Sequence, residues 1–312
     1  MANISGYALI QFVSFLSICL LSKYVPVEAQ HRCFQVERDA LLEFKKGLQD
    51  PSDKLSSWTG SECCNWAGVV CNNGSGRVIR LDLGGFPRYC DSSATDNRCL
   101  GGVISVSLRG LEFLSHLDLK NNNFSGLRIP DFIGSLRRLR YLDLSNASFS
   151  GLIPSRLGDL SDLRYLNLSQ SPSDENLWVE DLSWLSGLSS LNSLDLSNVN
   201  LSKASGDWLN VINSLPSLTE LRFSNCDIRE IPQSLGFVNV TSLRVLDLSK
   251  NQFNTSIPKW LNHITSLEHL RVESCGLEGQ VSEIVAKESC NLRILEAAFN
   301  EMEESTGLYL IP

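Results

Sequence analysis

The sequence predicts an α/β solenoid in which stacked strands form one curved parallel β-sheet on the concave face. Two observations predict this fold. The pattern Leu-x-x-Leu-x-Leu returns every 24 to 28 residues through most of the chain. A cysteine-bearing segment with a helical apolar pattern precedes the first copy, at the end where a solenoid needs a cap over its exposed strand.

The repeated pattern is regular enough to predict the number of strands. Its copies begin at Val78 in a degenerate form and then at Leu114, Leu139, Leu163, Leu191, Leu218, Leu243, Leu267 and Leu292. This period is typical of leucine-rich repeats, so residues 78–312 are expected to hold about nine of them. With strands about 4.8 Å apart, nine strands span roughly 38 Å along the solenoid axis.

Within each copy the residue types follow from the geometry of a strand. Side chains alternate, so Leu117 and Leu119 are predicted to point inward and Asp118 outward. One strand cannot bury its leucines alone, whereas stacked copies merge them into one core. The residues that follow, in the form Phe-x-Gly-x-Ile-Pro at 149–154, predict an extended path because proline cannot continue a helix.

The third residue after the last strand leucine has a structural role. Three copies place an amide there, predicted to bind backbone groups of the turn: Asn122, Asn251 and Asn300. Cys226 and Cys275 occupy the same position and are predicted to be small buried fillers rather than redox or metal-binding groups. Three other copies depart from the rule and should have weaker turns: Ala147, Ser171 and Val199.

Residues 1–29 are predicted to be a signal peptide. The run from Tyr7 to Leu21 is apolar but too short to span a membrane, and Ala29 suits a cleavage site. An uncleaved anchor is the alternative. No later run reaches the roughly 18 apolar residues of a membrane helix, so no such helix is expected in this chain. The chain is therefore expected to be secreted or to lie on the extracellular side of the plasma membrane.

Export gives meaning to the Asn-x-Ser/Thr triplets, because these are acceptor sites for N-glycans. Beyond residue 29 they occur at Asn73, Asn123, Asn146, Asn167, Asn200, Asn239 and Asn254. This density is typical of a glycosylated extracellular protein.

Residues 30–77 are predicted to form an N-terminal cap. The segment VERDALLEFKKGLQDP places Ala40, Leu41, Phe44 and Leu48 on one helical face and ends before proline. Two tryptophans, Trp58 and Trp66, are expected to pack between this helix and the first strand.

The cysteines of an exported protein predict disulfides. Local pairing favours Cys33 with Cys63 and Cys64 with Cys71, and zinc binding by these four is the weaker alternative. A third bridge is expected between Cys90 and Cys99. The last cysteine, Cys290, is expected to stay buried and reduced.

Composition argues against several functions. The net charge of −8 is unlike the basic charge of nucleic-acid-binding proteins. The four histidines have no metal-ligand spacing, and no nucleophile or phosphate-loop motif is present, so we expect no enzyme, no cofactor and no metal. His116 and His269 occupy outward strand positions and are expected to face solvent, with contact to a ligand as the alternative.

Binding is the remaining function, and the outward strand positions form the surface where solenoids take partners. Tyrosine and arginine are frequent anchors in interfaces. The candidate ligand-binding residues are Arg140, Tyr141, Asp143, Arg164, Tyr165, Arg222, His269 and Arg271. The alternative for each is an ordinary polar surface. The longest spacing, 163–191, contains Trp178, Leu182, Trp184 and Leu185, expected to form an apolar cap on the convex side or a binding lid.

Several motifs resemble plant extracellular leucine-rich-repeat proteins. These are LSSW and CCNWAGVVCN in the cap, the Gly-x-Ile-Pro turns, and the run FSGLRIPDFIGSLRRLRYLDLSNASFSGLIP. From residue 33 onward the chain resembles the receptor-like proteins, in particular the receptors for fungal ethylene-inducing xylanase. The resemblance implies pattern recognition in plant immunity, with a protein or peptide ligand of microbial or plant origin and a co-receptor kinase as partners.

Members of that family carry more repeats, a C-terminal cap and a membrane helix, so this chain resembles the N-terminal part of a receptor. Two alternatives stay open. One is a soluble inhibitor of microbial wall-degrading enzymes, similar to the polygalacturonase inhibitors, whose cap cysteines have the same arrangement. The other is a non-functional receptor fragment, whose exposed leucines at the uncapped end would favour aggregation.

Overall fold

The computed structural model describes residues 33–84, 99–172, 177–234, 237–284, 291–303 and 308–310. The predicted signal peptide, Cys90 and Cys290 lie outside these ranges. Within the described residues, no helix is both long and apolar enough to cross a membrane.

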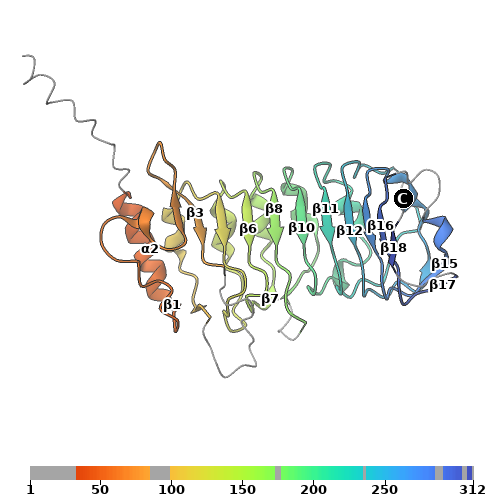
Figure 1. Cartoon of the computed structure of the whole chain (residues 1–312), viewed down its shortest axis with the longest axis horizontal. Helices are drawn as coiled ribbons and strands as arrows, with labels where there is room; N and C mark the ends of the chain where they lie inside the picture. Colours follow the sequence, from red (N-terminus) through yellow and green to blue (C-terminus); the bar gives the residue numbers. More distant parts are fainter. Residues whose placement is uncertain are drawn as a thin grey trace, which may run out of the picture.

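Nine parallel strands form the main sheet, one from each predicted repeat, and Figure 1 shows them side by side along the molecule. Each strand lies on the Leu-x-Leu or equivalent segment of its copy, so the predicted repeat positions are confirmed. The strands are β3 (Val78–Asp82), β5 (His116–Asp118), β6 (Tyr141–Asp143), β8 (Tyr165–Asn167), β10 (Ser193–Asp195), β11 (Glu220–Arg222), β12 (Val245–Asp247), β14 (His269–Arg271) and β16 (Ile294–Glu296).

Both edges of this sheet carry an antiparallel strand. Strand β2 (Val69–Cys71) of the N-terminal cap pairs with β3, and β18 (Leu308–Leu310) pairs with β16. An unpaired strand edge exposes backbone donors and acceptors, so these two strands cover groups that the nine repeats leave open.

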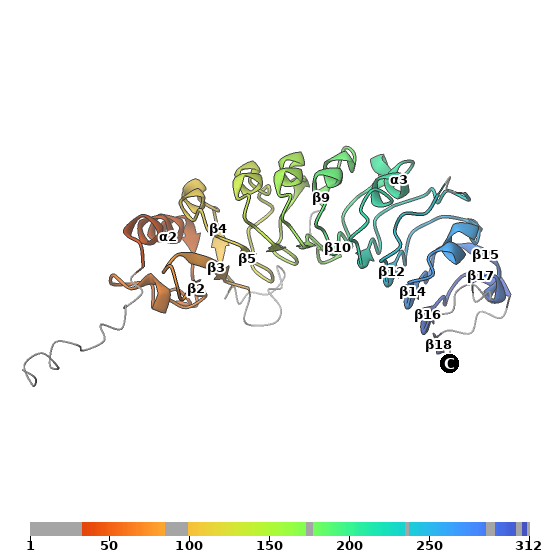
Figure 2. The ribbon, with the colours of Figure 1, turned by 90° about the horizontal axis from the view of Figure 1, so that it is seen from above.

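The convex side carries short helices, and Figure 2 shows them on the outer side of an arch whose inner side is the sheet. The helices are η2 (Val106–Gly110), η3 (Asp131–Ser135), η4 (Ser155–Asp159), η5 (Ser183–Gly187), η6 (Ser202–Ala204), α3 (Trp208–Ile212), η7 (Lys259–His263) and η8 (Val281–Glu283). Neighbouring helices approach closely at glycines. A Cβ added at Gly158 would lie 2.4 Å from the carbonyl oxygen of Trp184, so only glycine fits there.

Segments that follow the turns, among them the Gly-x-Ile-Pro copy at 149–154, form small sheets on one flank of the arch. Strand β7 (Gly151–Leu152) pairs with β9 (Leu177–Trp178), and β13 (Thr255–Ser256), β15 (Leu277–Gln280) and β17 (Glu301–Glu303) form a three-stranded sheet. The predicted extended path is therefore also a paired one.

The interior is a continuous stack of aliphatic side chains. Leu117, Leu142 and Leu166 are fully buried in three successive strands, and their Cα atoms are direct partners in the register. Two phenylalanines of the turns, Phe124 and Phe149, are stacked with ring centroids 4.8 Å apart. This continuity confirms the predicted shared core.

The third residue after the last strand leucine joins neighbouring turns where it is asparagine or cysteine. The Asn251 side-chain amide donates to the carbonyl oxygens of Phe223 and Leu248, both at 2.7 Å, and its oxygen accepts from the Cys226 backbone amide at 3.1 Å. Cys226 is buried and its thiol donates to Leu196 O at 3.2 Å, as Cys275 does to Leu248 O. Burial raises the thiol pKa of both cysteines, that of Cys275 to about 12, which fits unreactive fillers.

The N-terminal cap packs as the sequence predicts. Helix α2 (Gln35–Gly47) buries Ala40, Leu41 and Phe44, and Trp58 and Trp66 stack with centroids 5.5 Å apart. The prediction that Leu48 belongs to this helical face is wrong. Leu48 follows the helix and lies in β1 (Leu48–Gln49), which pairs with β4 (Gly101–Gly102).

The disulfides of the cap join Cys33 to Cys63 and Cys64 to Cys71, as predicted. These four cysteines therefore form disulfides instead of the alternative zinc site. These bonds include Cys63 and Cys64 of the short helix η1 (Cys63–Asn65). Cys99 is also disulfide-bonded. Its predicted partner, Cys90, lies outside the described residues.

The segment with the longest spacing is only partly a convex cap. Leu182, Trp184 and Leu185 are buried on the convex side, as expected. Trp178 lies instead in β9 on the flank, where the Lys203 ammonium is 4.5 Å from its ring centroid. Residues 173–176 lie outside the described part of the chain, and the predicted lid remains a prediction.

Candidate functional site

The concave face consists of two rows of side chains, one from each outward position of the nine strands. The register pairs equivalent positions of neighbouring strands directly, so each row runs along the arch. The first row is Arg80, His116, Tyr141, Tyr165, Ser193, Glu220, Val245, His269 and Ile294. The second row is Asp82, Asp118, Asp143, Asn167, Asp195, Arg222, Asp247, Arg271 and Glu296.

Three rings of the first row form a stack, which we call the ring ladder: His116, Tyr141 and Tyr165. The His116 and Tyr141 centroids are 4.0 Å apart with planes at 8°, and those of Tyr141 and Tyr165 are 4.3 Å apart with planes at 3°. Parallel strands fix this spacing, because side chains in register are separated by about one strand width. All three side chains are half-buried.

Acidic residues of the second row support the ladder. The Tyr141 hydroxyl donates to Asp143 Oδ2 at 3.1 Å, and Asp143 is only 2% exposed. Lys120 Nζ lies 2.9 Å from Asp118 Oδ2 and 3.9 Å from Asp143 Oδ2. Burial, with the nearby Asp143 carboxylate, raises the pKa of both Tyr141 and Tyr165, so both phenols stay neutral. Asp143 is thus a support for the tyrosines more than an accessible contact.

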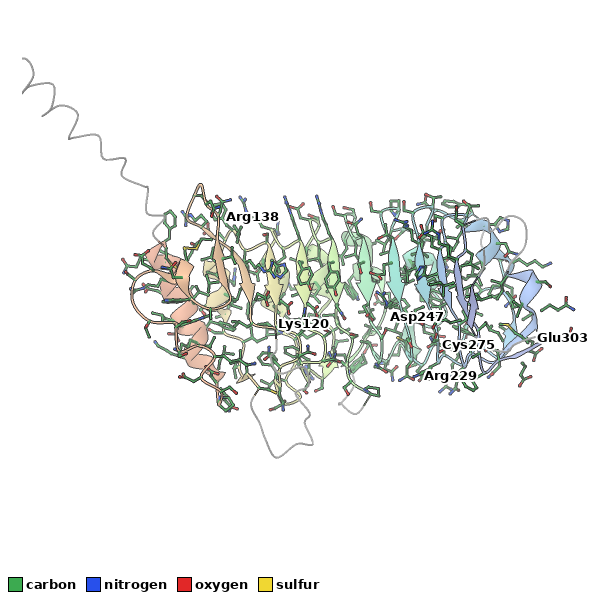
Figure 3. All side chains as sticks on the ribbon, viewed as in Figure 1. Lys120, Arg138, Arg229, Asp247, Cys275 and Glu303 are labelled. Atoms are coloured by element: carbon green, nitrogen blue, oxygen red, sulfur yellow. A yellow bond between two sulfur atoms is a disulfide. The ribbon has the colours of Figure 1, made fainter. Side chains whose placement is uncertain are left out.

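Arg140 and Arg164 precede strands β6 and β8, and both are exposed at one edge of the ladder. Within the described chain, neither forms an ion pair. Figure 3 shows Arg138 at this edge of the sheet and Lys120 at the opposite edge. The ladder therefore runs between an arginine edge and the acidic second row.

The far half of the concave face has a different character, made of ion pairs between neighbouring side chains. Arg222 is bound to Glu220 of the same strand, and Arg271 Nε donates to Glu296 Oε1 at 2.9 Å. His269 lies in the first row of this half and is partly exposed. The candidate residues therefore do not form one cluster. Tyr141 and Tyr165 are part of the ladder, and Arg140, Asp143 and Arg164 lie beside it, whereas Arg222, His269 and Arg271 lie farther along the sheet.

One group on this face has donor atoms that could hold a metal ion. Ligand atoms of Asp82, His116 and Asp118 lie within 4.8 Å of one another. Both carboxylates already carry a cation of the chain, since Arg80 lies 2.6 Å from Asp82 and Lys120 is bound to Asp118. A metal would have to displace these partners, so the donor set fits a metal poorly.

The predicted glycan acceptors differ in accessibility. Asn73, Asn146 and Asn254 are exposed, and Asn123, Asn200 and Asn239 are partly buried. Asn167 lies in strand β8 on the concave face, and its side-chain amide donates to the Tyr165 hydroxyl at 3.3 Å. Which of them carry glycans remains a prediction.

The sequence reasoning missed one member of the ladder. His116 was expected to face solvent, but it is half-buried and stacked on Tyr141. Burial lowers its pKa, and the nearby Arg80 adds to that effect. The signal was present in the sequence, because His116 occupies the same position of LSHLDL that Tyr141 occupies in LRYLDL.

Comparison with known proteins agrees with this architecture. Residues 35–72 match the family described as leucine rich repeat N-terminal domain, and residues 98–279 match the leucine-rich repeat region. Among solved structures, the ectodomain of the Arabidopsis receptor kinase HAESA in complex with an IDA peptide hormone ligand superposes with a TM-score of 0.62. It is 26% identical, over 85% of this chain and 45% of that one. The GASSHO1/SCHENGEN3 ectodomain, also from Arabidopsis thaliana, has a TM-score of 0.64 and 29% identity over 85% of this chain and 30% of that one.

Two receptor-like proteins of Solanum lycopersicum are more similar in sequence. EIX1 is 40% identical over 286 residues, which are 88% of this chain and 27% of that protein. EIX2 is 42% identical over 257 residues, 80% of this chain and 24% of that protein. The chain spans about a quarter of the length of these relatives. On the evidence of its repeats, its disulfide-bonded cap and these matches, the chain belongs to the leucine-rich-repeat family and is similar to the N-terminal part of plant receptor-like proteins.

Proposed function

We propose that this chain is an extracellular ligand-recognition region of a plant immune receptor of the receptor-like-protein type, and that it works by binding rather than by catalysis. Its concave face takes a protein or peptide ligand, and signalling requires recruitment of a partner receptor kinase. The localisation that follows is secretion, or the extracellular side of the plasma membrane.

The single observation that carries this proposal is the ring ladder. Three stacked rings form a rigid amphipathic surface between an arginine edge and an acidic row, and tyrosine and arginine are the residues that most often anchor interfaces. Preorganised rings lose little side-chain entropy when a ligand binds. The solved HAESA ectodomain, which is similar in fold, binds a peptide hormone and the co-receptor SERK1, and this supports binding as the activity of the scaffold.

The test uses the secreted chain with fungal ethylene-inducing xylanase as the first probe and a displayed random-peptide library as the second. Surface plasmon resonance measures affinity for the wild type and for the double variant Tyr141→Ala, Tyr165→Ala. Truncating two interface anchors should weaken binding by at least about tenfold.

The control is Phe237→Ala, which removes a 70% exposed aromatic side chain outside the strands and should leave affinity unchanged. A chain that binds neither the xylanase nor any library peptide contradicts the proposal, as does a double variant of unchanged affinity. Loss of xylanase turnover on binding would instead favour the alternative, a soluble inhibitor of wall-degrading enzymes.

A further inference from the structure

The ring ladder ends at Tyr165 because the next side chain of the first row is small. Ser193 is the direct register partner of Tyr165 in strand β10. One face of the Tyr165 ring is stacked on Tyr141, and no second ring or cation of the described residues stacks on Tyr165. A hydroxymethyl group cannot fill the volume of a ring, so that second face is available to a partner.

The opposite end of the ladder, beside His116, differs from the Tyr165 end at one residue of the adjoining strand. There the first row holds Arg80 beside His116, and Asp82 of the second row binds the Arg80 guanidinium at 2.6 Å. At the Tyr165 end, strand β10 has Ser193 and Asp195 at the same two positions. Strand β10 keeps the carboxylate but has no cation of its own, so it has half of the arrangement that β3 completes, and the positive charge next to Asp195 comes from Arg222, its register partner in β11.

Two carboxylates lie on the strands that follow Tyr165 in the sheet, Asp195 in β10 and Glu220 in β11. Asp195 accepts from the Ser197 backbone amide at 2.9 Å, and no cation of the described chain forms an ion pair with it. Arg222 of the next strand is bound to Glu220, and Glu220 Oε2 accepts from the Ser193 hydroxyl at 2.8 Å. The two carboxylates and the one guanidinium of this group sum to one net negative charge: Asp195, Glu220 and Arg222.

A cation over an aromatic face is an arrangement that this chain uses elsewhere. Arg77 lies 3.6 Å from the Phe34 centroid, Arg138 lies 4.5 Å from that of Phe113, and Lys203 lies over Trp178. The ring quadrupole attracts positive charge, and a neighbouring carboxylate adds a charge-assisted hydrogen bond.

We propose that Tyr165, Ser193, Asp195 and Glu220 form a recognition site for a basic side chain of a peptide ligand, arginine above all. The guanidinium stacks on the free face of Tyr165 over Ser193 and donates to Asp195, as Arg80 does to Asp82 at the other end of the ladder. This inference rests on the proposed function, since it assigns a ligand chemistry to the same concave face.

The experiment titrates the secreted chain with N-acetyl-arginine methylamide and with its neutral citrulline analogue, followed by saturation-transfer NMR. We expect the arginine probe to bind about 2- to 30-fold more tightly than the citrulline probe, which is a cation–π contribution of about 0.5–2 kcal/mol converted to affinity. Asp195→Asn should remove most of that preference. Ser193→Arg should abolish binding, because the new side chain occupies the site itself.

The matched control is Ser186→Arg, which adds the same charge at an exposed position of the convex helix η5 and should bind as the wild type does. Equal affinity for the two probes, or unchanged arginine binding by Ser193→Arg, overturns the inference. If the arginine probe shows no binding while the double variant Tyr141→Ala, Tyr165→Ala still loses affinity for its protein ligand, the proposed function stands and only this inference is wrong.

Discussion

The two halves of the concave face are built on the same interior but carry different chemistry. Strands β5, β6 and β8 present stacked rings, and the central ring, Tyr141, donates to the buried Asp143 carboxylate, whereas β11, β14 and β16 present ion pairs. Beneath both halves the central strand leucine is almost fully buried. The comparison teaches that the repeat fixes the core and leaves the two outward positions of each strand free to differ.

The largest expected effect is a loss of stability on truncating a core leucine, and it tests whether the interiors of the two halves are alike. Leu142→Ala lies under the ring ladder and Leu246→Ala under the ionic half, and both leucines are at most 1% exposed. Each variant should lower the free energy of unfolding by about 2–5 kcal/mol, because a cavity remains where the side chain was. Denaturant unfolding followed by circular dichroism gives the two values. A loss confined to one variant would show that the halves differ inside as well.

A smaller effect should separate the two surfaces. Tyr141 stacks on rings at both sides, so Tyr141→Ala should cost about 1–3 kcal/mol for the two ring pairs. Arg271→Ala breaks a half-exposed ion pair with Glu296 and should cost about 0–1 kcal/mol. The same unfolding measurement applies. Equal costs would contradict the distinction between a packed half and an ionic half.

The ring half should also respond to pH through His116. Burial lowers the imidazole pKa in the folded chain, with a further contribution from Arg80. The unfolded chain therefore takes up this proton first as pH falls below about 6.5, and stability is lost in that direction. The stability advantage of the wild type over His116→Phe should shrink as pH is lowered from about 7.5 to about 5. Melting temperatures of both proteins, measured across this range, check the sign of the change.

The smallest effect belongs to the ionic half alone. Salt screens exposed charges, so raising NaCl from about 0.05 M to about 0.5 M should reduce the cost of Arg271→Ala to a few tenths of a kcal/mol. The cost of Tyr141→Ala should hardly change, since ring stacking is not an ionic interaction. A salt effect of equal size on both variants would contradict the assignment.

The fold was predictable because every repeat places the same residue types at the same spacing. The spacing of the leucines located all nine parallel strands, and the position of Cys226 predicted its burial in the asparagine row. The local pairing of the cap cysteines was equally accessible, since adjacent cysteines do not readily bond to each other.

The candidate site was predictable only in outline. Sequence position assigned Tyr141 and Tyr165 to the outward row, but ring orientation depends on neighbours about one strand away, which brought His116 into the ladder. The same contacts turned Asp143 into a buried support. Pairing of Arg222 and Arg271 with glutamates depends on side-chain rotamers that no repeat pattern specifies.

The strict register of the sheet gives equivalent positions to all repeats, and two of the repeats also have the same length. The unit that begins at Leu139 and the unit that begins at Leu243 both run 24 residues to the next copy, at Leu163 and Leu267. Exchanging the two by genetic recombination would move Tyr141 and Asp143 to the place of Val245 and Asp247 without adding or deleting a residue. Such shuffling offers this chain a route to new binding preferences that leaves its scaffold intact.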